Sequence, residues 1–250
     1  MTVTFSTDML LLLAPAFFAG LVIAATHVPL GQEVLKRGII FIDLAIAQIA
    51  ALGVVIGDVI FHVEAGIFSF VLALVFALAG SFLFGWLERK APRLQEPFIG
   101  CTFVISASLI ILVLAHDPHG GEEMQGLLAG QILWVSWQQV LLTALAYAGI
   151  LFAWFRFKAK RALLFYALFP LMITLSVQLV GVYLVFASLI IPALGASSFD
   201  NRILAGYIIS FLAVMSGLVL SVVTDLPAGP VLVCVYGIVG AGAYLRNRNL

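Results

Sequence analysis

The chain has 250 residues, of which 64% are hydrophobic and only 10% are charged. Twelve Lys and Arg balance twelve Asp and Glu, and no basic patch is interleaved with aromatic residues, which argues against a nucleic-acid-binding protein. Apolar runs of about 17–25 residues are long enough to cross the hydrocarbon core of a bilayer. Runs of that length, separated by short polar clusters, predict an all-α polytopic membrane bundle in place of a soluble fold, with one domain over residues 1–250.

Nine candidate spans follow one another along the chain. They cover about residues 9–28, 38–60, 66–87, 98–115, 138–155, 162–179, 181–197, 203–223 and 229–245. The seventh is the shortest, and no polar loop separates it from the sixth. A single tilted helix over 162–197 would reduce the number of spans to eight.

The distribution of Lys and Arg decides between eight and nine spans, because these residues prefer the cytoplasmic flank of a span. Nine spans that start outside place all twelve Lys and Arg on the cytoplasmic side. Eight spans would move Arg202 and the two C-terminal Arg outside. The pattern therefore favours a break near 178–181, with the N-terminus outside and the C-terminus in the cytoplasm.

The chain lacks the motifs that would make it an enzyme. It has no Gly-x4-Gly-Lys-Ser/Thr phosphate loop, no Gly-x-Ser-x-Gly and no His-Glu-x-x-His, so it cannot be its own ATPase. Cys101 and Cys234 fall in different spans and predict neither a disulfide framework nor a metal knuckle. We expect no permanently bound cofactor.

Asp43 is the one acidic or basic residue that we place inside a span, since Asp58 stands at the outer exit of the second span. Charged groups within the membrane are costly and usually functional. A lone carboxylate with an amide nearby, at Gln48, suits either cation handling or a structural hydrogen bond. We take both residues as candidates for a translocation path.

A second group of candidate residues lies in the loops predicted to be outside. Imidazole and carboxylate groups together suit zinc and similar divalent ions, whereas their charge alone would concentrate cations in a funnel. We interpret the group as a low-affinity cation funnel, with a solvated acidic loop as the alternative. Its members are His62, Glu64, His116, Asp117, His119, Glu122 and Glu123.

Four stretches, in the expected order, carry a resemblance to one known family. Residues 35–53 begin with Leu35-Lys36-Arg37-Gly38, and residues 180–193 run from Val180-Gly181 to Pro192-Ala193. The other two cover 130–136 and 221–230. Together they resemble the permease subunits of ABC importers for zinc, manganese and iron. This resemblance implies a homodimer in the bacterial inner membrane, two cytoplasmic ATPase subunits, an extracytoplasmic metal-binding protein and a divalent metal ion as transported substrate.

The second span departs from the family pattern. The family typically places an Asp four residues before a His there, and both line the metal path. Here Gln48 occupies the His position and Leu44 the Asp position, whereas Asp43 lies one residue earlier. Residues five apart differ by about 140° on a regular α-helix, so Asp43 and Gln48 converge only if a π-bulge realigns them.

The cytoplasmic segment before the sixth span is also much shorter than in the family, where it contacts the ATPase. Either the short basic loop that remains or another loop, near Arg202, makes that contact. The basic residues of the short loop are Arg156, Lys158, Lys160 and Arg161.

We therefore predict the permease subunit of an ATP-driven importer of divalent metal ions. Zinc is the first choice because of the outer histidines, with manganese and iron as alternatives. An ABC permease for another small solute such as a metal chelate, an ion-coupled secondary carrier that uses Asp43 as a proton site, and an accessory membrane protein are the competing hypotheses.

Overall fold

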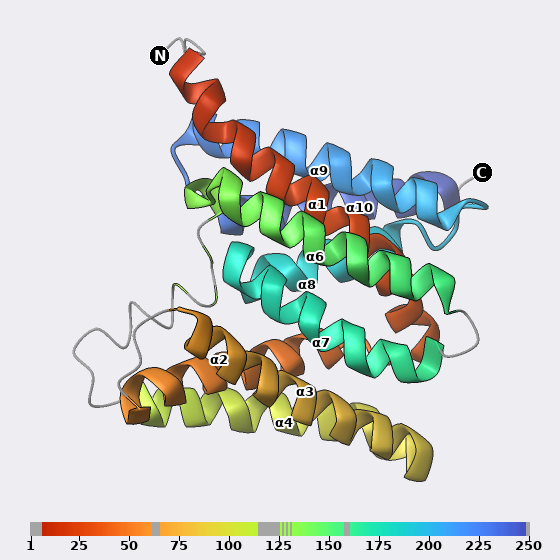
Figure 1. Ribbon diagram of the computed structural model, residues 1–250. Helices are drawn as coiled ribbons and strands as arrows, with labels where there is room; N and C mark the ends of the chain where they lie inside the picture. Colours follow the sequence, from red (N-terminus) through yellow and green to blue (C-terminus); the bar gives the residue numbers. More distant parts are fainter. Residues whose placement is uncertain are drawn as a thin grey trace.

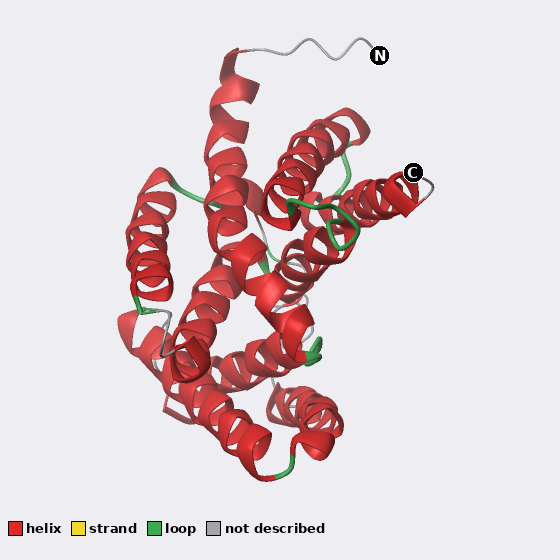
Figure 2. Cartoon of the chain, turned by 90° about the vertical axis from the view of Figure 1, so that its right-hand side faces the viewer, coloured by secondary structure: helices red, strands yellow, loops and turns green. Residues whose placement is uncertain are grey.

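The computed structural model describes residues 7–61, 66–114, 132–157 and 161–248, together with residues 126, 128 and 130. These residues form helices and short connections and include no strand (Figure 2). The prediction of an all-α bundle is confirmed. The α-helices are α1 (Thr7–Arg37), α2 (Ile42–Phe61), α3 (Ile67–Lys90), α4 (Pro92–Leu114), α6 (Trp137–Arg156), α7 (Arg161–Val180), α8 (Val182–Gly195), α9 (Arg202–Thr224) and α10 (Ala228–Arg248), with a 3-10 turn, η1 (Ile132–Trp134), before α6.

Each predicted span corresponds to one of these α-helices. Seven of them are long and apolar enough to cross a membrane, namely α1, α3, α4, α6, α7, α9 and α10. A helix satisfies its backbone hydrogen bonds internally, which is why apolar runs adopt it in lipid. The first span was predicted too short, because α1 continues to Arg37, where an i,i+4 ion pair with Glu33 supports its last turns.

The break between the sixth and seventh spans is where the charge pattern predicted it. Helix α7 ends at Val180, Gly181 takes a left-handed conformation with φ of 77°, and α8 starts at Val182. Gly130 packs against this break so closely that a Cβ atom on it would lie 2.1 Å from the carbonyl oxygen of Val180. A side chain at residue 130 would therefore push the two segments apart.

Helix α8 lies in the middle of the bundle (Figure 1). It packs against α1, α9 and α10 and also contacts α2 and α7. Helices α2, α3 and α4 form a separate layer, which is joined to the rest mainly where α7 contacts α3 and α2. Small residues allow the close approaches within that layer, as where Gly53 of α2 lies against Ala73 of α3.

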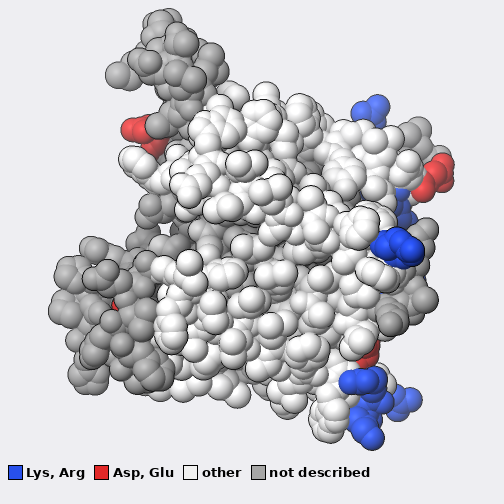
Figure 3. Space-filling model, in the orientation of Figure 1, with Lys and Arg blue, Asp and Glu red and all other residues white. Residues whose placement is uncertain are grey.

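The described Lys and Arg side chains gather at one end of the bundle. On the face that Figure 3 shows, the blue side chains lie only along the edge where α1 and α3 end and α9 begins. Helix α1 starts at the opposite end, and α10 finishes at the basic end (Figure 1). We expect the basic end to be cytoplasmic, because Lys and Arg favour that side of a membrane.

Candidate functional site

A cavity of about 380 Å³ opens between α2, α4, α8 and α10. Leu44, Gln48 and Ala51 line it from α2, and their spacing of four and three residues places them on one face of that helix. Phe103 and Ile110 of α4 and Tyr183 and Phe186 of α8 are among the residues that complete a largely apolar wall. We refer to this space as the α2 cavity.

Gln48 supplies the main polar group of the α2 cavity. Its side chain is 5% exposed, and its amide makes no hydrogen bond to any other residue that the structure describes. A free amide in a cavity can offer its oxygen to a passing cation or polar solute.

Asp43 does not line the α2 cavity with Gln48. Helix α2 is a regular α-helix from Ile42 to Phe61, without the π-bulge that would bring the two residues onto one face. Asp43 is only 1% exposed, and neither of its carboxylate oxygens has a hydrogen-bond partner among the described residues. The two sequence candidates therefore belong to different surroundings.

Glu96, which sequence reasoning did not single out, is the second carboxylate near Asp43. Its Oε1 accepts a hydrogen bond from the backbone N–H of Phe41 at 3.4 Å, and its Oε2 is buried without a partner. The hydrogen bond to Phe41 holds Glu96 beside the first turn of α2, close enough for its negative charge to oppose ionisation of Asp43. Only the packing of α4 against α2 reveals the pair, because Glu96 comes from a different span.

A buried polar network around His27 was also missed. The His27 ring is fully buried, with Nδ1 2.8 Å from Ser188 Oγ and Nε2 2.9 Å from Ser176 Oγ. Ser176 in turn bonds to the hydroxyl of Tyr147. These four residues connect α1, α6, α7 and α8. The sequence features that could have indicated this network are an isolated histidine in an apolar run and the polar residues Ser176 and Ser188 inside two later spans.

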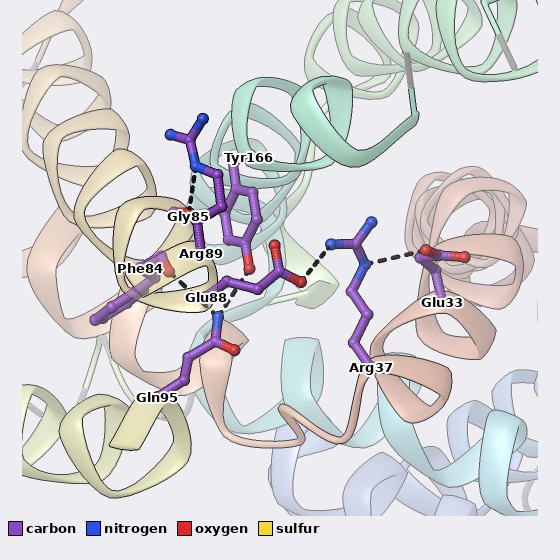
Figure 4. Close-up of polar contacts among 8 residues, drawn as sticks. All are labelled: Glu33, Arg37, Phe84, Gly85, Glu88, Arg89, Gln95 and Tyr166. Carbon is purple, nitrogen blue, oxygen red and sulfur yellow. Dashed lines mark hydrogen bonds and ion pairs between the residues drawn. The ribbon is translucent and has the colours of Figure 1, made fainter. Parts of the chain in front are cut away.

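Several charged residues form a cluster at the basic end of the bundle, shown in Figure 4, which we call the Arg37 cluster. Arg37 donates hydrogen bonds to Glu33 and Glu88, both at 3.0 Å, and its guanidinium lies 4.4 Å from the centre of the Phe165 ring. Tyr166, next to Phe165, accepts a 2.8 Å hydrogen bond from Gln95. The cluster ties the ends of α1 and α3 to the starts of α4 and α7.

The candidate ATPase contacts lie at this same end where the structure describes them. Arg156 and Arg202 are exposed, at the end of α6 and the start of α9. Arg161 is half-buried and places its guanidinium 5.2 Å from the Trp154 ring centre. Lys158 and Lys160 lie outside the described residues.

The predicted outer funnel cannot be placed, because all of its residues lie outside the described ranges. These residues are His62, Glu64, His116, Asp117, His119, Glu122 and Glu123. Within the described ranges, no group of three or more His, Cys, Asp or Glu side chains could hold a metal ion.

The sequence matches the ABC 3 transport family over residues 9–162 and 159–245. It is 26% identical over 249 residues to the high-affinity zinc uptake system membrane protein ZnuB of Haemophilus influenzae, an alignment that covers 89% of this chain and 93% of that protein.

Two solved structures share the fold. PsaBC from Streptococcus pneumoniae, solved in complex with a Fab, matches with a TM-score of 0.74 and 21% identity over 93% of this chain and 91% of that one. An inward-facing structure assigned to the metal-chelate type of ABC transporter matches with a TM-score of 0.68 and 14% identity over 98% and 91%.

Proposed function

The chain belongs to the ABC 3 transport family and is a multi-pass permease subunit of a metal ABC importer, not an enzyme, and from this we propose that it carries divalent metal ions across the bacterial inner membrane, with zinc as the first substrate. The similarity to a zinc uptake protein and the two histidines of the outer loop, His116 and His119, support zinc. Manganese and iron are the alternative ions.

The observation that carries the proposal is the α2 cavity with Gln48 in its wall. A permease needs an interior space that its solute can occupy, and this one lies among helices from both parts of the bundle. An amide in an otherwise apolar wall would hold a cation weakly, since such an oxygen is a poor ligand for zinc compared with imidazole or thiolate. Weak holding suits a passage from which the ion must leave again.

The energy for import would come from partners. The chain has no phosphate-binding loop, so ATP hydrolysis belongs to cytoplasmic ATPase subunits, which would contact the basic end of the bundle. An extracytoplasmic metal-binding protein would deliver the ion, and two copies of the chain would form the permease. Gln48 remains our candidate for the inner part of the path, whereas Asp43 does not line the α2 cavity.

A metal chelate is the second candidate substrate, because the α2 cavity favours it. A volume of about 380 Å³ exceeds the space that one bare ion needs, and its aromatic and aliphatic lining suits an organic ligand with a few polar atoms.

Reconstitution tests the proposal. The chain is purified with any ATPase encoded beside it, placed in liposomes, and assayed for uptake and for metal-stimulated ATP hydrolysis with zinc, manganese, iron and a metal chelate in turn. We expect ATP-dependent uptake of zinc. Uptake driven by an ion gradient without the ATPase would establish a secondary carrier, and no uptake of any substrate would favour an accessory protein.

A further inference from the structure

The buried carboxylate of Asp43 has no partner among the described residues that compensates its negative charge. It lies in the first turn of α2 and is 1% exposed, and the backbone N–H groups of Asp43 and Leu44 are close to it but make no hydrogen bond of ordinary geometry to either oxygen. The ion pairs among the described residues join Arg37 to Glu33 and Glu88, so no described Lys or Arg neutralises Asp43. A buried carboxyl group is stable only when it is protonated, paired, hydrated or bound to a cation.

Glu96 adds a second negative charge next to Asp43, and together the two carboxylates could bind a cation. Its Oε1 is held by the N–H of Phe41, two residues before Asp43, which fixes the start of α4 against the start of α2. Its Oε2 is buried without a partner. Two like charges repel when they are brought together, and one bound cation would remove the repulsion and satisfy all three free oxygens.

We propose that Asp43 and Glu96 form a cation-binding site between the starts of α2 and α4, on a helix face other than that of the α2 cavity. The donors are carboxylate oxygens, and the only described histidine, His27, is already engaged by two serines. All-oxygen ligation suits hard divalent cations such as Mn²⁺ and Mg²⁺, with water or backbone carbonyl groups completing the coordination sphere.

This site is a property of the permease itself and does not rest on the proposed transport of zinc. It lies at the basic end of the bundle, so an ion there would also link α2 to α4 beside the Arg37 cluster. A hard-cation site at this place would make the ion a structural bridge between the two helices.

The experiment titrates the purified full-length chain, without the ATPase, with Mn²⁺ and follows free Mn²⁺ by electron paramagnetic resonance. Asp43→Asn and Glu96→Gln keep the shape of each side chain and remove its charge, and Asp200→Asn removes an exposed carboxylate at the same end as the matched control. We expect either site variant to weaken one class of bound Mn²⁺ at least tenfold and the control to leave it unchanged. Acidic loop residues are common to all samples and cancel in the comparison.

A second measurement separates binding from folding. With no metal present, Asp43→Asn should melt at the same temperature as the unmodified chain or higher, because it removes an uncompensated charge. Mn²⁺ should raise the melting temperature of the unmodified chain and of the Asp200→Asn control, but not that of Asp43→Asn. Equal Mn²⁺ binding by all variants, or a lower melting temperature of metal-free Asp43→Asn, would overturn the site in favour of a carboxylate that only caps α2. Intact zinc uptake with no Mn²⁺ site would overturn this inference alone, and an intact site without uptake would overturn only the proposed function.

Discussion

Replacing His27 with Leu tests whether the buried polar network holds the centre of the bundle together. The substitution keeps a large apolar side chain but removes the contacts of both ring nitrogens, to Ser176 and Ser188. The two hydroxyl groups keep hydrogen bonds to backbone carbonyl groups of their own helices, at 2.8 and 3.1 Å, so no donor is left unpaired. The cost is therefore that of two side-chain hydrogen bonds between helices.

Hydrogen bonds between membrane helices contribute about 0.6 kcal/mol on average and at most about 1.7 kcal/mol. Two of them predict a loss of about 1 to 3 kcal/mol for His27→Leu. In a protein of this size that corresponds to a fall in Tm of roughly 5 °C. Ser188→Ala removes one of the two contacts and should cost about half as much.

Thermal unfolding of the purified chain in detergent, followed by tryptophan fluorescence, measures the effect. Ser108→Ala is the matched control, because the hydroxyl group of this exposed residue bonds only within its own helix, to the carbonyl of Val104. The double variant His27→Leu with Ser188→Ala should lose less than the sum of the single losses, since both changes remove the same contact. If His27→Leu melts like the control, the network does not stabilise the bundle, and if the two losses simply add, His27 and Ser188 do not stabilise it through their mutual contact.

The remaining predictions concern the break in the bundle, the loop that contacts the ATPase and the membrane orientation. Gly130→Ala should prevent stable folding, because φ at this residue is 65° and the added Cβ would meet the backbone of Val180. Gly100→Ala is the control and should leave the melting temperature unchanged in the same assay, because no atom lies within 4 Å of the position of its Cβ. Reversing Lys158, Lys160 and Arg161 to Glu should abolish co-purification with the ATPase while membrane insertion persists, and undiminished co-purification would redirect the contact to Arg202. A cysteine at Ser198, in a chain without its native cysteines, should react with a membrane-impermeant maleimide only after permeabilisation; labelling of intact cells would reverse the predicted orientation of this end.

The positions of the helices could be predicted from the sequence because each membrane span is specified by its own local run of apolar residues. An apolar run must form a helix in lipid whatever its neighbours are, so each of the nine predicted spans corresponds to an α-helix among the described residues. Even the break at Gly181 could be predicted, since an unbroken helix would have put Arg202 and the last two arginines on the wrong side.

The site could be predicted only in part, because its contacts join residues far apart in the chain. Helix geometry limited the relation of Asp43 to Gln48 to two cases, with or without a π-bulge, since that relation lies within one helix, and α2 has no bulge. The partners of His27 are 149 and 161 residues away, and Glu96 reaches Asp43 only because α4 packs on α2. Local patterns of polarity and length in one sequence do not show which helices become neighbours.

The shortness of α8 has a consequence for the surrounding lipid. Its 14 residues rise about 21 Å, whereas the hydrocarbon core of a bilayer is about 30 Å thick. Because α8 is enclosed by α1, α9 and α10, these longer helices, and not α8, set the match between the protein and the bilayer. A change of lipid chain length should therefore act on the outer helices and leave α8 unstressed, so we expect the rate of transport to respond to membrane thickness only through them.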